Sequence, residues 1–117
     1  MTPLQRDKLE AGMEVIQDEI GEWSGKNFGN QPSWRPLLGI GEELGELNHA
    51  YLKLSQGIRG NREELENKLV DAVGDLMIYL ADFCCKEGIY MGRCMIDAWK
   101  EVSQRDWKKY PKNGRTE

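Results

Sequence analysis

Apolar side chains recur at steps of three and four residues along most of the chain, which is the spacing of one face of an α-helix. β-branched residues are sparse, and no internal repeat or low-complexity tract interrupts the pattern. The helical stretches fall at about residues 3–23, 36–56, 62–87 and 89–108. Because two of the connections are short, this order predicts an all-α fold, a four-helix antiparallel bundle in a single domain over residues 1–117.

Short motifs mark the ends of these helices. Thr2 is followed three residues later by Gln5, and Asn61 is followed by Glu64, which is the spacing of a capping box. A capping box satisfies backbone N–H groups that have no partner inside the helix. Gly57 stands where the second helix is expected to end, because glycine readily takes the left-handed conformation that closes a helix.

Two further expectations concern a loop and the last helix. The segment 24–33 is rich in Gly, Asn and Pro, which predicts a long polar loop containing Phe28 and followed by Trp34. The last helix is expected to bury its apolar stripe, which consists of Met91, Met95, Trp99 and Val102.

Composition limits the partners of the chain. Among its 117 residues, 16 are Lys or Arg and 20 are Asp or Glu, which gives a net charge of −4. That balance argues against nucleic-acid binding, although the C-terminal tail at about residues 109–117 is basic. No apolar run approaches the ~20 residues that span a bilayer, and the start of the chain lacks the layout of a signal peptide. We therefore expect a cytoplasmic protein with no nucleic-acid and no membrane partner.

Acidic residues lie beside the apolar stripes of two helices. At about 100° per residue, Glu43 borders the stripe of the second helix, Glu46 lies one turn further on and Glu42 points further out. Asp71 and Asp75 lie at the edge of the stripe of the third helix. Carboxylates brought together at a seam between helices repel one another unless protons or a cation compensate. Four carboxylates without imidazole or thiolate suit Mg²⁺, or Mn²⁺, which prefer oxygen ligands.

These residues also carry a family resemblance. The sequence from Ile40 to Leu47 contains two adjacent glutamates and a third three residues later, and it resembles the Glu-Glu-x-x-Glu signature of MazG-like nucleoside triphosphate pyrophosphohydrolases. The sequence from Asp71 to Leu80 resembles the second motif of that family. The resemblance implies an enzyme that uses Mg²⁺ to cleave (d)NTPs between the α- and β-phosphates, in a role such as cleaning the nucleotide pool.

The resemblance also implies a set of metal ligands. Glu43, Glu46 and Asp75 match ligands of the family, whereas Ala72 stands where the family usually has glutamate. Asp71 is the candidate replacement for that missing ligand, because positions three and four residues apart share a helix face.

The attacking water and the nucleotide need further residues. Glu46 and the more outward Glu42 are both candidates to orient or deprotonate the water, and the sequence does not choose between them. Cations opposite the acidic wall would bind the phosphates. The resemblance implies that Arg105 approaches the phosphates and that Tyr79 contacts the nucleotide, and Asn27 could hydrogen-bond the edge of the base. The candidates for substrate binding are Lys53, Arg59, Arg105, Tyr79 and Asn27.

Two other functions would also place acidic residues on helices. A di-iron bundle needs Glu-x-x-His pairs, and the chain has one histidine, which is not spaced in that way. A catalytically impaired helical module, used for oligomerisation or nucleotide binding, is the alternative, and Ala72 is its one sequence hint. A single bundle of this size leaves its acidic seam open, so a homodimer or homotetramer is expected.

Overall fold

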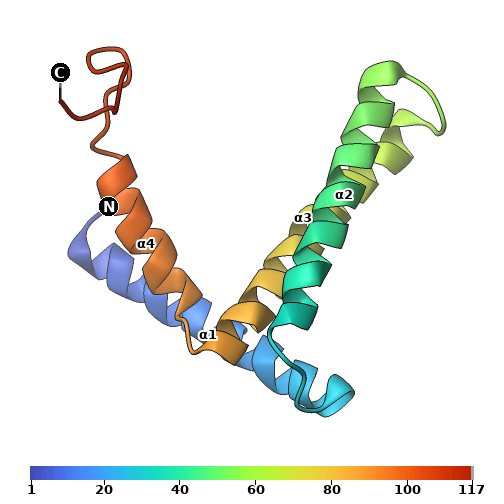
Figure 1. Cartoon of the computed structure of the whole chain (residues 1–117), viewed down its shortest axis with the longest axis horizontal. Coiled ribbons are helices and arrows are strands. Elements are labelled where there is room, and N and C mark those ends of the chain that lie inside the picture. The colour runs from blue at the N-terminus through green and yellow to red at the C-terminus, as the bar shows by residue number, and fades with distance from the viewer. Residues whose placement is uncertain (117) are drawn as a thin grey trace. The chain divides into compact units, whose positions relative to one another are not determined.

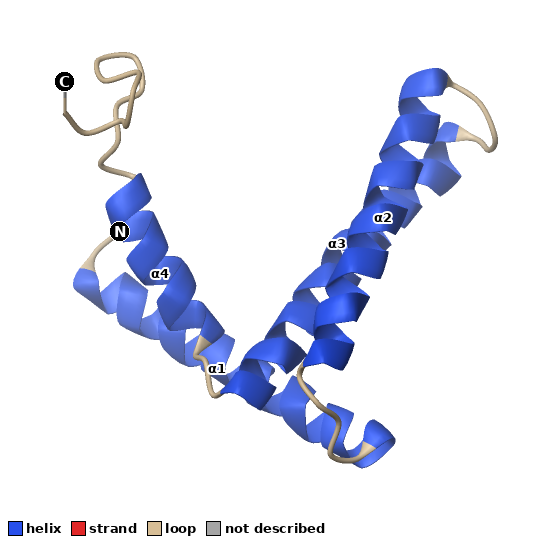
Figure 2. Ribbon diagram, viewed as in Figure 1, coloured by secondary structure: helices blue, strands red, loops and turns tan. Residues whose placement is uncertain are grey.

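The computed structural model describes residues 1–116, and within them every regular element is a helix (Figure 2). This confirms the all-α class. The four helices are α1 (Pro3–Phe28), α2 (Trp34–Gln56), α3 (Arg62–Glu87) and α4 (Met91–Val102). No helix in the described part of the chain is both long and apolar enough to cross a membrane.

The chain forms two compact units. One comprises residues 17–88, and the other combines residues 1–16 with the described residues from position 89 onward. In the first unit, α2 and α3 lie side by side as an antiparallel hairpin, and the second half of α1 packs against the end of α3 (Figure 1). In the other unit, α4 approaches α1 where Gly92 meets the side chain of Met13.

The predicted capping motifs form as expected. The backbone N–H of Gln5 donates to the hydroxyl of Thr2 at 3.1 Å, and the N–H of Thr2 donates to the side-chain oxygen of Gln5 at 2.8 Å. The side chain of Asn61 accepts from the N–H of Glu64 at 2.8 Å. Left-handed glycines close the next two helices, as glycine allows: Gly57 at φ 69° after α2 and Gly88 at φ 68° after α3.

The predicted loop at residues 24–33 is wrong over its first half. Helix α1 continues to Phe28, and the connection to α2 is only residues 29–33. Ser24, a weak helix former, is fully buried and its hydroxyl donates to the carboxylate of Asp82 at 2.9 Å. This contact between α1 and α3 offsets the poor helix propensity of the Gly- and Asn-rich stretch, because tertiary packing overrides propensity.

Helix α4 is shorter than predicted, because it ends at Val102 instead of near residue 108. Beyond Val102 the chain folds back on itself. The side chain of Asp106 accepts from the backbone N–H groups two and three residues further on, at 3.1 and 3.0 Å. The N–H of Asp106 donates to the carbonyl of Gly114 at 2.8 Å. These local bonds compete with continued helix, which is the usual effect of aspartate in a turn.

The buried apolar core is small. It consists of Ala50, Leu65, Ala72, Ala81, Cys84 and Ile96. The expected burial along α4 is wrong for three of its four positions, since Met95, Trp99 and Val102 are exposed. A pair of helices covers only one side of each partner, so larger apolar side chains away from the contact remain at the surface.

Candidate active site on the α2–α3 hairpin

Asp75 of α3 lines two of the pockets within the unit of residues 17–88. The first pocket has a volume of about 510 Å³ and is called the aromatic pocket below. Beside Glu43 and Asp75, its lining includes Trp23, Phe28, Gln31, Arg35, Tyr79 and Asp82. The second has a volume of about 620 Å³ and is called the acidic pocket. Its lining includes Glu42, Glu46, His49, Lys68, Asp71 and Asp75.

Helical spacing explains how four acidic residues come to line the acidic pocket. Glu42 and Glu46 are four residues apart, so they lie one turn apart on the same face of α2. Asp71 and Asp75 have the same relation on α3. Because α2 and α3 pack against each other, the two acidic faces meet along one seam. The structure thus brings together four of the five acidic residues predicted from sequence in the acidic pocket.

Glu43 is the most perturbed of these carboxylates. Its Oε2 atom is buried and has no hydrogen-bond partner. Loss of hydration raises the pKa of Glu43 above its usual value, and the negative charges of Glu46 and Asp75 raise it further. The carboxylate is therefore disfavoured in its ionised form and would be stabilised by a proton or a cation.

This perturbation makes stability depend on pH. A raised pKa means that, above the ordinary value, the folded chain binds more protons at Glu43 than the unfolded chain does, so stability falls as pH rises through the folded pKa. Replacement of Glu43 by Gln removes the charge from this half-buried side chain. We expect Glu43→Gln to melt higher than the wild type at pH 7, and its melting temperature to fall less than that of the wild type from the ordinary titration range of glutamate up to pH 7.

Circular dichroism melting across this pH range, without divalent cation, measures the effect. Glu14→Gln is the matched control, because Glu14 is an exposed glutamate of α1 in the other unit. Equal melting temperatures for Glu43→Gln and the wild type at every pH would show that Glu43 carries no unfavourable charge in the folded chain.

Tyr79 lies between the two helices of the hairpin. Its ring packs on the backbone of Gly39 in α2, where an added Cβ would come within 2.7 Å of the ring carbon Cζ. Burial raises the pKa of the Tyr79 phenol, and the charges of Glu42 and Glu43 raise it further. The hydroxyl therefore stays protonated, and Tyr79 lines the aromatic pocket beside Asp75, as its spacing of four residues predicts.

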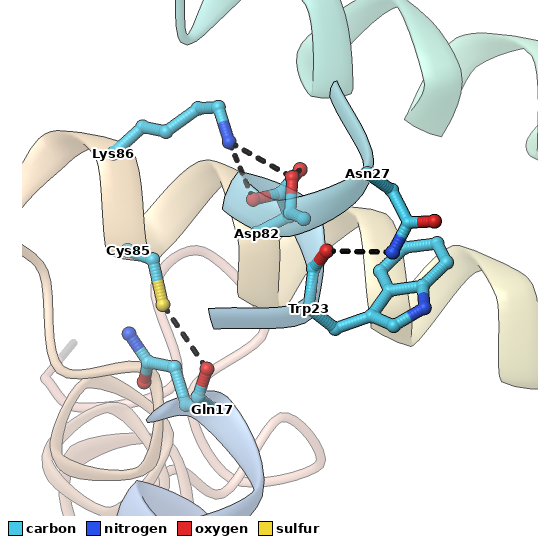
Figure 3. Close-up of polar contacts among 7 residues, drawn as sticks. Gln17, Trp23, Asn27, Asp82, Cys85 and Lys86 are labelled. Carbon is cyan, nitrogen blue, oxygen red and sulfur yellow. Dashed lines mark hydrogen bonds and ion pairs between the residues drawn. The ribbon is translucent and has the colours of Figure 1, made fainter. Parts of the chain in front are cut away.

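The remaining predicted substrate-binding residues do not line either pocket. Asn27 lies in α1, where its amide donates to the backbone carbonyl of Trp23 at 2.9 Å (Figure 3). Lys53 lies in the last turn of α2 with its Nζ bonded to Gln56 at 3.1 Å. Arg59 lies in the turn between α2 and α3, and Arg105 belongs to the other unit.

Ala72 and Asp71 are neighbours on α3 but differ in burial. Ala72 is buried against α2, whereas Asp71 is exposed and turned toward the acidic pocket. Among residues 1–116, no three ligand side chains are arranged to hold one metal ion. A cation held at this seam would therefore require new rotamers for the exposed carboxylates, chiefly Glu46 and Asp75.

Two groups of pocket residues lie outside the predicted metal-ligand and substrate-binding set, although the sequence does suggest Asp82 as a partner for a neighbouring cation. Lys68 and His49 line the acidic pocket. The sequence could have predicted the position of Lys68, because it lies three residues before Asp71 on the same face of α3. The second group is Asp82, which lines the aromatic pocket, and Lys86, which forms an ion pair with it at 2.6 Å. Their spacing of four residues signals the pair, but only the fold shows that Ser24 joins it.

No family model matches the chain, and no curated protein or solved structure shows significant similarity to it. A function for the chain therefore rests on the residues of the two pockets. The two pockets differ in chemistry: the acidic pocket offers mainly carboxylates, and the aromatic pocket offers aromatic rings together with hydrogen-bonding groups.

Proposed function

We propose that this chain is a cytoplasmic, Mg²⁺-dependent nucleoside triphosphate pyrophosphohydrolase that cleaves (d)NTPs to (d)NMP and pyrophosphate. The observation that carries the proposal is the position of Asp75, which lines both the acidic and the aromatic pocket. A nucleotide has a polyphosphate that requires compensated charge and a base that stacks on aromatic rings. Two adjoining pockets of these kinds suit its two ends.

The acidic pocket has the chemistry of a magnesium site. Its oxygen-only carboxylate donors suit a hard divalent cation, and the buried, unpartnered oxygen of Glu43 and the mutual repulsion of the acids favour cation binding. The residues that would hold the ion are Glu43, Glu46, Asp71 and Asp75. Magnesium supplies charge neutralisation for the phosphate oxygens when bound.

Carboxylates of the chain would accept a proton from the attacking water. Hydrolysis adds one water across the α–β anhydride, so a proton must leave the water as its oxygen bonds to phosphorus. Glu42 and Glu46 both line the acidic pocket and are exposed, so either is placed to accept that proton. Lys68 is the cation of the same pocket and is placed to pair with phosphate oxygens of the leaving pyrophosphate.

The resemblance of the two acidic motifs to MazG-like enzymes agrees with this proposal. It adds the expectation that the four helices complete a bundle of the MazG-like type. A helical module without catalysis is the second candidate, and the burial of Ala72 at the position of the family's usual glutamate favours it.

Pyrophosphate release separates the two candidates. We expect pyrophosphate, and no orthophosphate, from a panel of NTPs and dNTPs with Mg²⁺, and no product with a chelator present. Anion-exchange chromatography of the nucleotides and an enzymatic pyrophosphate assay measure both products. Orthophosphate release, or silence across the panel with Mg²⁺ and with Mn²⁺, would reject the proposed reaction.

A homodimer or homotetramer is part of the proposal. Large apolar side chains remain exposed on the α2–α3 hairpin, and exposed apolar surface is typical of a face that contacts another chain. They include Leu37, Leu44, Tyr51, Val73 and Met77. We expect sedimentation equilibrium at micromolar concentration to give a mass of two or four chains, and a mass of one chain would contradict the proposal.

A further inference from the structure

The carboxylate of Asp82 is held in one position at the wall of the aromatic pocket. Its Oδ1 accepts from Lys86 Nζ at 2.6 Å (Figure 3). Its Oδ2 accepts from the hydroxyl of Ser24 at 2.9 Å. The Lys86 ammonium also reaches the Ser24 oxygen at 3.2 Å. Only 12% of the Asp82 side chain is exposed, so the three groups hold one another where solvent hardly enters.

This carboxylate still has hydrogen-bonding capacity. A carboxylate offers about four lone-pair sites and donates nothing when it is paired with an ammonium. Lys86 and Ser24 use one site on each oxygen. Because Asp82 lines the aromatic pocket, its remaining capacity is to accept, and not to donate, hydrogen bonds from a molecule there.

The position of Asp82 along α3 corresponds to the base of a nucleotide. Asp75, Tyr79 and Asp82 are spaced by four and three residues, so they follow one face of α3. Asp82 lies seven residues from Asp75, about 10 Å along the helix axis. With the phosphates at the acidic end near Asp75, the far end of a nucleoside would lie near Asp82.

The aromatic residues beside Asp82 suit a planar ring. Trp23 and Phe28 both line the pocket and meet edge to face, with ring centroids 5.5 Å apart and planes at 85°. Because the two rings are nearly perpendicular, a base stacked on one of them meets the edge of the other. Stacking accepts any base, so selection must come from the polar groups of the pocket.

We propose that Asp82 makes the enzyme prefer nucleotides whose base carries an exocyclic amino group, namely cytosine, adenine or guanine, over uracil and thymine. This inference rests on the proposed function. The amino groups donate hydrogen bonds that a fixed carboxylate accepts. Uracil and thymine offer one ring N–H between two carbonyl oxygens, and those oxygens are repelled by the carboxylate.

Steady-state kinetics with dCTP, dATP, dGTP, dUTP and dTTP tests the preference. We expect the wild type to have a kcat/KM at least about tenfold higher for the best amino-bearing substrate than for dUTP and dTTP, the size of one well-made base contact. Asp82→Asn should reduce this ratio to about threefold or less, because the Asn amide can donate to a carbonyl oxygen. Asp7→Asn, an exposed control in the other unit, should keep the wild-type ratio.

Binding measurements make the result independent of catalysis. Isothermal titration with dCMP, dGMP and dUMP, in the absence of metal, should show the same order of affinity for the wild type and loss of that order in Asp82→Asn. Ser24→Ala keeps the carboxylate but removes one of its anchors, so its preference should fall between the two. Thermal melting of each variant establishes that it is folded.

The outcomes separate this inference from the proposed function. Equal kcat/KM values for all five nucleotides in the wild type, or an unchanged preference in folded Asp82→Asn, would overturn the role of Asp82 and leave the hydrolysis intact. Asp82-dependent binding of monophosphates without any pyrophosphate release would overturn the hydrolysis and retain the base site. Absence of both binding and release would overturn both. A collapse of folding in Asp82→Asn leaves the wild-type comparison as the deciding test.

Discussion

Asp75→Asn is expected to lower the rate of pyrophosphate release by at least about a hundredfold while the protein stays folded. Asp75 lines both pockets, so its charge bears on the phosphates and on the carboxylates around Glu43 together. Loss of one well-placed electrostatic group in an active site costs about 10²–10³-fold in rate. The side chain is exposed and the amide has the same shape, so the melting temperature should change by no more than a few degrees.

Initial rates of pyrophosphate release under saturating nucleotide and Mg²⁺ measure this effect. Asp7→Asn makes the same chemical change on an exposed position of α1 and should retain the wild-type rate. Glu42→Gln should be intermediate if Glu46 can also accept the proton. An Asp75→Asn protein with wild-type turnover would remove the central residue of the proposed site, and the hydrolysis would have to be placed elsewhere in the chain.

Gly39→Ala is expected to destabilise the chain by about 1–3 kcal/mol, the usual cost of forcing extra atoms into a packed contact. The added Cβ would lie 2.7 Å from Cζ of Tyr79 and closer still to two other ring carbons. The ring is rigid, so the clash is relieved only if Tyr79 changes rotamer or α2 moves away from α3. Either movement displaces Tyr79 in the aromatic pocket, and we expect a raised KM for the nucleotide.

Gly41→Ala is the matched control for this substitution. Gly41 lies two residues further along α2, and a Cβ there meets nothing within 4 Å. Without a clash, replacing a helical glycine by alanine should stabilise the chain by about 0.5–1 kcal/mol. The double variant Gly39→Ala with Tyr79→Ala should recover part of the lost stability. Equal effects of Gly39→Ala and Gly41→Ala in chemical denaturation would show that the ring does not pack on Gly39.

The ends of the helices were predictable where one short motif determines them. Thr2 with Gln5 and Asn61 with Glu64 form their capping contacts as their spacing predicts, and Gly57 ends α2 in the left-handed conformation. These contacts join residues within one turn of each other, so the chain nearby contains all the information that they need.

The helix ends that were not predictable depend on contacts beyond the neighbouring helical turn. The sequence predicts a loop at residues 24–28 because serine, glycine and asparagine favour turns. Ser24 is nevertheless held in α1 by a hydrogen bond to Asp82, which lies 58 residues further along the chain. At the other end, α4 stops early because the chain after Val102 returns to bond with Asp106. Neither contact leaves a periodic signal in the sequence.

The candidate site shows the same division. Helical periodicity placed Glu42, Glu46, Asp71 and Asp75 on faces that share one pocket, because positions four residues apart stay on one face. Periodicity could not place Asn27, Lys53 or Arg59, whose positions depend on where each helix ends and which neighbour it meets.

By itself, the sequence determined the all-α class, the order of the helices and the acidic faces of α2 and α3, because these follow from local propensity and a period of 3.6 residues. The tertiary structure decided which groups share a pocket, that Glu43 loses hydration and that Ser24 and Lys86 hold Asp82. Burial and electrostatic coupling depend on distances between segments, and no pattern within one segment contains those distances.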